Sequence, residues 1–247
     1  MHSPTTVRVF ETADEVAHAA AEQFVERAQN SSRISGRFAV ALAGGTTPRR
    51  MYELLAGNQF RNAIDWTTVQ LFFGDERFVP SDHPESNYRL ASDALISQVE
   101  IPSVNIHRIE IQADATSSAT RYESELHHFF KDVDVPRFDL VLLGLGEDGH
   151  TASLFPNTNA LNVTDKWVVA NFVEKLESYR ITLTARAINA AANVMFLVAG
   201  ANKAPAVSAV LNGPFQPESL PAQLIKPEAG TLTWLLDAPA ASLLAQH

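Results

Sequence analysis

The sequence predicts an α/β protein built on a mostly parallel, Rossmann-like sheet with helices on both faces. Short apolar runs alternate with segments of helical spacing, as expected for a parallel sheet covered on both sides. Several runs are apolar at consecutive positions and end in glycine-rich or charged loops. The fold class includes a small additional strand and loop region. Strands are expected at 7–10, 38–43, 69–73, 105–109, 140–143, 167–173, 180–184, 194–199 and 231–236.

Helices are expected between these strands, and two of them carry clear start signals. Thr12 and Glu15 fit a capping box in front of a helix over 13–28, and Ser86 is a cap of the same chemical type. No repeat, low-complexity tract or linker divides the chain, so we expect one domain over residues 1–247. Further helices are expected near 122–130, 185–192 and 204–211.

Composition limits the classes of function. The chain has 247 residues and a net charge of −9, so a nucleic-acid partner, which needs a basic face, is not expected. The absence of cysteine excludes disulfides, thiolate nucleophiles and cysteine-based zinc sites. The amino-terminal residues have no signal-peptide pattern, and no apolar run reaches the roughly 18 residues of a membrane span. We therefore expect a cytoplasmic protein without a membrane partner, either a monomer or a homodimer.

The loop Gly44-Gly45-Thr46-Thr47-Pro48 connects an expected strand to an expected helix. Such a loop directs backbone N–H groups and hydroxyls at one point, where the helix dipole also favours an anion. Proline suits the first helical turn, and a threonine before it suits the cap. Phosphate is therefore a natural ligand, although a simple capped turn explains the residues equally well. The loop is not a Walker motif, because no Lys-Ser or Lys-Thr follows the glycines.

Charged and polar residues also follow three other expected strands. Asp75 and Arg77 follow 69–73, Asp148 and His150 follow 140–143, and Lys203 follows 194–199. Taken singly, Asp75 with Arg77 is better explained as a solvated ion pair, and Lys203 as a solvated lysine. The carboxyl ends of parallel strands share one edge, where ligands bind in such sheets. Their convergence there predicts an anion site beside an imidazole.

The segment Gly144-Leu-Gly-Glu-Asp-Gly149 literally matches the dinucleotide-binding fingerprint. Glu147 would face the pyrophosphate, and Pro156 cuts short the helix that should follow, so the match is weak. A nicotinamide-dependent dehydrogenase remains an alternative. No serine-nucleophile elbow and no compact metal-ligand spacing is present, so we expect no metal site. The remaining candidate is His150 acting on water, with Asp148 able to hold one ring tautomer.

Several ordered motifs together resemble the 6-phosphogluconolactonases of the glucosamine/galactosamine-6-phosphate isomerase superfamily. The related glucosamine-6-phosphate deaminases carry a glutamate where this chain has Phe155, which favours lactone hydrolysis over deamination. The motifs are Ala43-Gly-Gly-Thr-Thr-Pro48, Gly74-Asp-Glu-Arg-Phe-Val-Pro80 with Ser86-Asn87, Gly144-Leu-Gly-Glu-Asp-Gly-His-Thr-Ala-Ser-Leu-Phe-Pro156, Arg180-Ile-Thr-Leu-Thr184 and Gly200-Ala-Asn-Lys203.

The resemblance implies a cofactor-independent hydrolase of 6-phospho-D-glucono-1,5-lactone in the second step of the pentose phosphate pathway. It implies His150 as the base toward water, with Asp75 and Asp148 either orienting that ring or contacting sugar hydroxyls. A sugar-phosphate isomerase or deaminase of the same superfamily and a non-catalytic sugar-phosphate sensor remain alternatives. The implied substrate-binding residues are Gly44, Gly45, Thr46, Thr47, Asp75, Arg77, Arg180 and Lys203.

Overall fold

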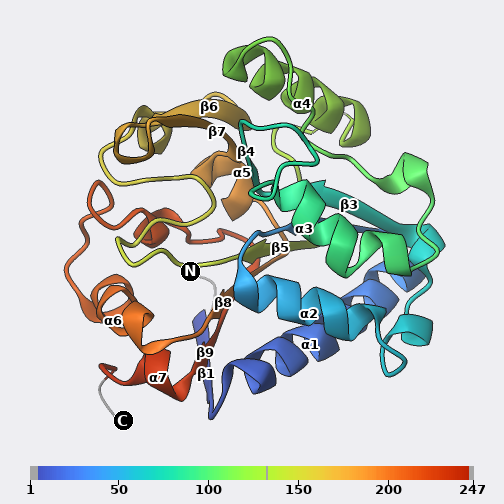
Figure 1. The fold of residues 1–247 in the computed structure, drawn as a ribbon, viewed down its shortest axis with the longest axis horizontal. Helices are drawn as coiled ribbons and strands as arrows, with labels where there is room; N and C mark the ends of the chain where they lie inside the picture. The colour runs from blue at the N-terminus through green and yellow to red at the C-terminus, as the bar shows by residue number, and fades with distance from the viewer. Residues whose placement is uncertain (1–4, 132, 245–247) are drawn as a thin grey trace.

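The large sheet has six parallel strands and runs through the middle of the molecule (Figure 1). The structure is a computed structural model that describes residues 5–131 and 133–244. All six strands pair in parallel, which confirms the predicted fold class. In spatial order the strands are β1 (Thr5–Phe10), β9 (Thr231–Asp237), β8 (Asn193–Val198), β5 (Leu140–Leu143), β2 (Phe38–Leu42) and β3 (Val69–Phe73).

Helices and a second sheet cover the two sides of this layer. Figure 1 shows α1, α2 and α3 on one side, and the second sheet with α5 and α6 on the other. The central strands β2 and β5 are buried along their whole length, which explains their continuous apolar sequences. The helices are α1 (Ala13–Ser35), α2 (Thr46–Ala56), α3 (Asn87–Ala94), α4 (Ala115–Phe129), α5 (Ala185–Asn189), α6 (Ala204–Asn212) and α7 (Ala238–Ala241).

The second sheet is antiparallel, with the order β4 (Asp75–Arg77), β7 (Ser178–Leu183) and β6 (Val168–Val173). It is the additional region predicted beside the main sheet. β4 was not expected as a strand, because its sequence Asp-Glu-Arg has the polarity of a loop. Glu76 is nevertheless buried, since its carboxylate accepts bonds from the N–H groups of Arg77, Asn87 and Tyr88 and from the Ser86 hydroxyl. These four donors replace water around a buried carboxylate.

Other boundaries differ from the prediction in understandable ways. The predicted strand over 105–109 is wrong: Ile106 makes only an isolated bridge to Leu71, next to a 3₁₀ turn. Helix α1 continues past the expected end at Ala28 to Gly36, whose φ of 74° closes the helix in the left-handed region. Thr12 and Ser86 cap α1 and α3 as predicted.

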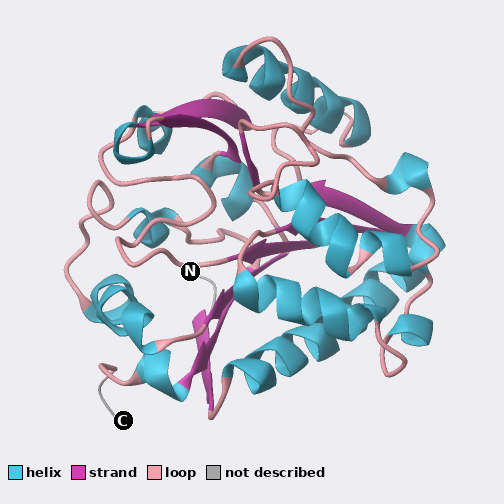
Figure 2. Ribbon diagram, viewed as in Figure 1, coloured by secondary structure: helices cyan, strands magenta, loops and turns pink. Residues whose placement is uncertain are grey.

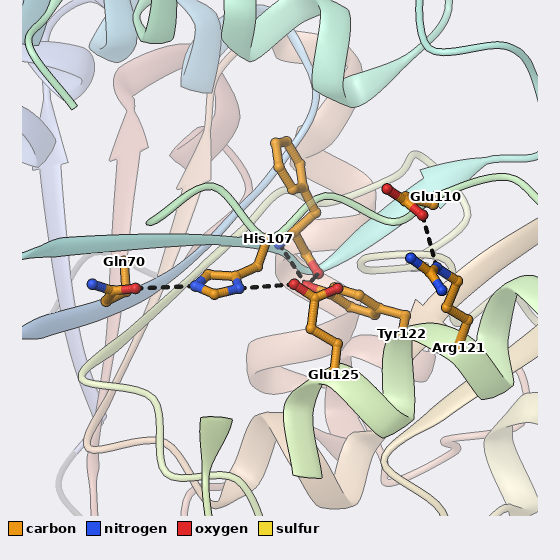
Figure 3. Close-up of polar contacts among 7 residues, drawn as sticks. Gln70, His107, Glu110, Arg121, Tyr122 and Glu125 are labelled. Atoms are coloured by element: carbon orange, nitrogen blue, oxygen red, sulfur yellow. Dashed lines mark hydrogen bonds and ion pairs between the residues drawn. The ribbon is translucent and has the colours of Figure 1, made fainter. Parts of the chain in front are cut away.

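Helix α4 is tied to the edge strand β3 by polar side chains (Figure 3). The imidazole of His107 lies between the side chains of Gln70 and Glu125, at 3.0 and 2.8 Å, and stacks on Phe72. This contact joins three parts of the chain around one partly buried ring: β3, the segment that follows α3, and the helix α4. After β5, by contrast, the chain runs as loop and short turns until β6 (Figure 2).

Two buried tyrosine hydroxyls bond backbone groups at the carboxyl ends of β2 and β3. The Tyr122 hydroxyl accepts from the N–H of Phe73 at 2.9 Å and donates to its carbonyl at 3.0 Å. Tyr52 makes the same pair of bonds with Ala43, just after β2, at 3.0 and 2.8 Å. Burial raises the pKa of both phenols, so they stay protonated and able to donate. Backbone groups that leave the sheet ladder at these points therefore keep partners.

Among the described residues, no helix combines the length and the apolar character that crossing a bilayer requires.

Replacing Tyr122 by phenylalanine should lower the free energy of unfolding by about 1–3 kcal/mol, because a buried N–H and a buried carbonyl lose their partner. Urea unfolding followed by circular dichroism measures this change. Tyr179→Phe is the matched control, since its ring is 45% exposed, and it should change stability by less than about 0.5 kcal/mol. Equal effects of the two changes would contradict this account of Tyr122.

Candidate active site

A cleft of about 310 Å³ opens at the carboxyl ends of β2, β5 and β8. It brings together most of the residues that the sequence singled out, although they come from distant parts of the chain. Arg180 and Asp148 are not among its lining residues. The predicted site residues that line it are Gly44, Gly45, Thr46, Thr47, Asp75, Arg77, His150 and Lys203.

The amino end of α2 forms one wall of the cleft. The expected threonine cap is wrong: α2 begins at Thr46, and Gly45, with φ of 109°, is the N-cap residue. No side chain caps this end, and no acidic residue lies in its first turn. The N–H groups of Thr46 and Thr47 precede the first helical bond, from Arg49 to Gly45. Unfilled donors at a helix amino end favour an anion.

Lys203 contributes a positive charge to the same cleft from the opposite side of β5. It lies where the 3₁₀ turn Ala201–Lys203 runs into α6, directly after β8. Gly200, with φ of 105°, makes this turn, and its N–H donates to both oxygens of buried Asp237 at 3.0 Å. Lys203 forms no ion pair within the described part of the chain, so its charge is available to a ligand.

Arg77 and Arg180 are direct neighbours across β4 and β7. Like charges at such positions repel, and burial together with the charge of Arg77 lowers the pKa of Arg180. Their guanidinium groups donate to neutral oxygens, Arg77 to the Glu85 carbonyl at 2.5 Å and Arg180 to the Ser178 hydroxyl at 2.8 Å. An anionic ligand beside Arg77 would relieve this repulsion.

The Asp75 side chain is hydrogen-bonded within a buried polar network. Its carboxylate accepts from the Ser153 hydroxyl at 2.6 Å and from the Asn87 amide nitrogen at 3.2 Å. The same amide nitrogen donates to the Asp75 carbonyl at 2.9 Å, which leaves the Asn87 amide oxygen on the other side. That oxygen is buried without a partner in the described chain, and Asn87 lines the cleft. A buried acceptor at a cleft wall suits a ligand hydroxyl.

Gly44 lies directly against this amide oxygen. A Cβ atom at position 44 would come within 2.0 Å of it, so only glycine permits the approach. Asp75 therefore orients Asn87, and the structure gives it no bond to His150.

His150 is held by Asp148 in the loop after β5. The Asp148 carboxylate oxygen Oδ1 lies 2.5 Å from His150 Nδ1 and 3.2 Å from its backbone nitrogen. The ring also stacks on Phe155, with centroids 4.0 Å apart and planes inclined by 22°. Nε2 has no hydrogen bond to the described residues, and the side chain is 28% exposed toward the cleft it lines. In a neutral imidazole, the bond to an ionised Asp148 requires the proton on Nδ1 and leaves the lone pair on Nε2.

The pKa of Asp148 lies well below its usual range. Burial opposes ionisation, but hydrogen bonds from His150 and from Lys175 outweigh it. Lys175, in the 3₁₀ turn Glu174–Leu176 between β6 and β7, forms an ion pair with the second carboxylate oxygen, Oδ2. Asp148 is therefore an ionised orienting group behind the imidazole.

The sequence interpretation missed Asn87 and Lys175 as site residues. Asn87 lay within a motif that carried the family resemblance, which was a usable signal. Nothing local marked Lys175, because its partner is 27 positions away. The dinucleotide fingerprint lacks its helix, since the described chain after Gly149 forms turns and no α-helix before Ala185. The nicotinamide-enzyme alternative therefore loses its phosphate site.

The chain belongs to the family described as glucosamine-6-phosphate isomerases/6-phosphogluconolactonase, whose model matches residues 11–234. It is 43% identical over 213 residues to a 6-phosphogluconolactonase from Nostoc sp., covering 85% of this chain and 86% of that protein. It is 46% identical over 209 residues to one from Synechocystis sp., covering 83% and 84%. A solved 6-phosphogluconolactonase from Trypanosoma cruzi superposes with a TM-score of 0.88 at 28% identity, covering 100% and 99%.

Gly146→Ala should break the contact between His150 and Asp148. A Cβ there would lie 1.9 Å from His150 Nδ1 and 2.6 Å from Asp148 Oδ1. Imidazole ¹⁵N spectra should then lose the Nδ1-protonated signal of His150. Gly144→Ala is the matched control, because a Cβ at that position meets nothing within 4 Å, and it should keep the signal. Retention of the signal in both variants would refute the steric argument.

Asp148→Asn should reduce stability in a pH-dependent way. A carboxyl with a depressed folded pKa contributes stability above its unfolded pKa of about 4 and loses it as pH falls further. The gap between wild type and variant should be about 1 kcal/mol near pH 6, allowing for the partial exposure of Asp148, and shrink below pH of about 4. Urea unfolding at several pH values measures it, and a constant gap would contradict the depressed pKa.

Proposed function

We propose that this protein hydrolyses 6-phospho-D-glucono-1,5-lactone to 6-phospho-D-gluconate, in the second step of the pentose phosphate pathway. The observation that carries the proposal is a single cleft shared by an oriented imidazole and an anion site. The imidazole is His150, and the anion site combines the amino end of α2 with Lys203. The names of the Nostoc and Synechocystis relatives support the same reaction.

The phosphate group would bind at the amino end of α2. The free N–H groups and hydroxyls of Thr46 and Thr47 would donate to its oxygens, and Lys203 would supply charge. Gly44 and Gly45 would let the backbone approach closely. This remote binding holds the lactone carbonyl near His150, which converts attack by water into an oriented reaction.

His150 would act first as a base and then as an acid. Nε2 takes a proton from water while the water oxygen bonds to C1 of the lactone, which places negative charge on the carbonyl oxygen. Arg77, which lines the cleft and is paired with Arg180 across β4 and β7, would balance that charge. When the bond between C1 and the ring oxygen breaks, Nε2 returns its proton to that oxygen. The new carboxylic acid then loses its own proton to solvent.

Phe155 supports hydrolysis over deamination. The related deaminases have a glutamate at this position, whereas here an apolar ring stacks on His150 and is 6% exposed. Phe155 therefore places an apolar ring, and not a carboxylate, against this face of the imidazole. The sugar-phosphate isomerase or deaminase alternative therefore lacks a group that its chemistry needs.

The cytoplasmic location, the absence of a nucleic-acid partner, and a monomeric or homodimeric state are parts of the same proposal. Gel filtration with light scattering tests the oligomeric state.

His150→Ala should lower kcat by about 10²–10⁴-fold with little change in KM, because it removes the base but leaves the phosphate site. The assay follows acid release from fresh lactone in a pH-stat and subtracts spontaneous hydrolysis. His128→Ala, on the exposed face of α4, is the control and should retain full activity. A folded His150→Ala protein with native turnover would eliminate the assignment. Binding of the lactone by the wild type without turnover would favour the sensor alternative.

Lys203→Met should raise KM for the phosphorylated lactone by about 10- to 100-fold, the value of a charge-assisted hydrogen bond. It should leave the reaction of unphosphorylated glucono-1,5-lactone nearly unchanged. Lys166→Met, an exposed lysine that does not line the cleft, serves as the charge-matched control. A fall in kcat alone, with KM unchanged, would show that Lys203 does not bind the phosphate.

A further inference from the structure

Lys175 lies at the tip of the β6–β7 hairpin, outside the cleft. Its side chain is 52% exposed, and its sequence neighbours Glu174 and Glu177 are both acidic. It pairs with neither in the described structure and instead reaches the loop after β5 to contact Asp148. An ion pair of an exposed lysine, such as the one between Lys175 and Asp148, adds little stability, and two other carboxylates lie closer to Lys175 in the sequence. The choice of partner therefore points to a role at the site.

The carboxylate of Asp148 is divided between two partners. Oδ1 bonds His150 Nδ1, and Oδ2 bonds the Lys175 amine. Asp148 lies between Gly146 and Gly149 in a loop and is 30% exposed, and both bonds from His150 go to Oδ1, so Oδ2 would face water without Lys175. The bond from Lys175 fixes the plane of the carboxylate and so the direction of Oδ1.

The same amine also contacts the aromatic ring that stacks on the imidazole. Lys175 Nζ lies 4.9 Å from the centroid of the Phe155 ring, which packs on His150 at 4.0 Å. The four side chains thus form a closed circuit: His150 to Asp148, Asp148 to Lys175, Lys175 to Phe155, and Phe155 back to His150. The Lys175 ammonium thus contacts both Asp148, which bonds the edge of the imidazole, and Phe155, which stacks on its face.

We propose that Lys175 is a positioning residue, which acts through Asp148 and Phe155 to fix the tautomer and orientation of His150. The β6–β7 hairpin is then part of the catalytic apparatus, although none of its tip residues lines the cleft. This inference rests on the proposed lactone hydrolysis by His150. It assigns to the second sheet a role in setting the geometry of a base that the first sheet carries.

The test compares Lys175→Met and Lys175→Arg in the full-length protein. Lys175→Met should lower kcat by about 10- to 100-fold, as loss of an outer orienting contact does, and change KM less than threefold, because the phosphate site is untouched. Lys175→Arg should restore most of kcat, since it can bond the same carboxylate and lie over the same ring. Glu177→Gln, in the same turn, is the control and should match wild type.

Two further measurements separate positioning from general stability. In an Asp148→Asn background, Lys175→Met should cause a much smaller loss of kcat than in the wild type, because only the contact with Phe155 remains to be lost. Imidazole ¹⁵N spectra should show the Nδ1-protonated tautomer of His150 in wild type and in Lys175→Arg, and a mixture of tautomers in Lys175→Met. His150→Gln identifies the signal among the eight histidines.

The outcomes are distinguishable from failure of the proposed function. If the wild type does not hydrolyse the lactone, the proposed function fails, while the spectra still test the circuit. If the wild type is active but Lys175→Met keeps wild-type kcat and tautomer, the positioning role is refuted. An equal loss of kcat in the wild-type and Asp148→Asn backgrounds would also refute it, because Lys175 would then act independently of Asp148.

Discussion

The hydrogen bond between Asp148 and His150 is the interaction on which the site depends. It forms only because Gly146 leaves room beside the ring: the space a Cβ would need is filled by His150 Nδ1 and Asp148 Oδ1. The bond directs one ring nitrogen inward to the protein and leaves the other facing the cleft. The loop after β5 thereby presents a single tautomer, and Gly146, part of a motif that resembles a nucleotide-binding one, serves a steric purpose instead.

The cleft lies where the two sheets meet, and each sheet supplies a different kind of chemistry. The parallel sheet supplies the imidazole, the helix amino end and Lys203 from its carboxyl edge. The antiparallel sheet supplies Arg77, whose neighbour across β4 and β7 is Arg180. Between the sheets lies the network of Asp75, Ser153 and Asn87, whose polar atoms are buried yet bonded, apart from one amide oxygen at the cleft wall. This buried network fixes the distance between Lys203 on the parallel sheet side and Arg77 on the antiparallel sheet.

Most of the parallel sheet could be predicted because strands such as β2, β5 and β8 are short continuous apolar runs, unlike the amphipathic helices around them. The convergence of the Gly44 loop, Asp75, His150 and Lys203 followed from the rule that parallel strands end on a common edge. β4 could not be found, because its residues are charged and three of the four donors to Glu76 come from Ser86, Asn87 and Tyr88, which only the fold brings near. The same reason hid Lys175, since a tertiary ion pair leaves no local pattern.

The cleft is lined by the cations Lys203 and Arg77, whereas the chain as a whole has a net charge of −9. A doubly charged substrate is therefore repelled by the molecule as a whole and attracted only close to Lys203 and Arg77. At physiological ionic strength the screening length is about 8 Å, so repulsion by the more distant surface charges is largely screened. Salt ions in solution thus reduce the repulsion between the anionic ligand and the negatively charged protein, and so favour its binding. The enzyme can remain strongly acidic, and so resist self-association, without excluding an anionic substrate.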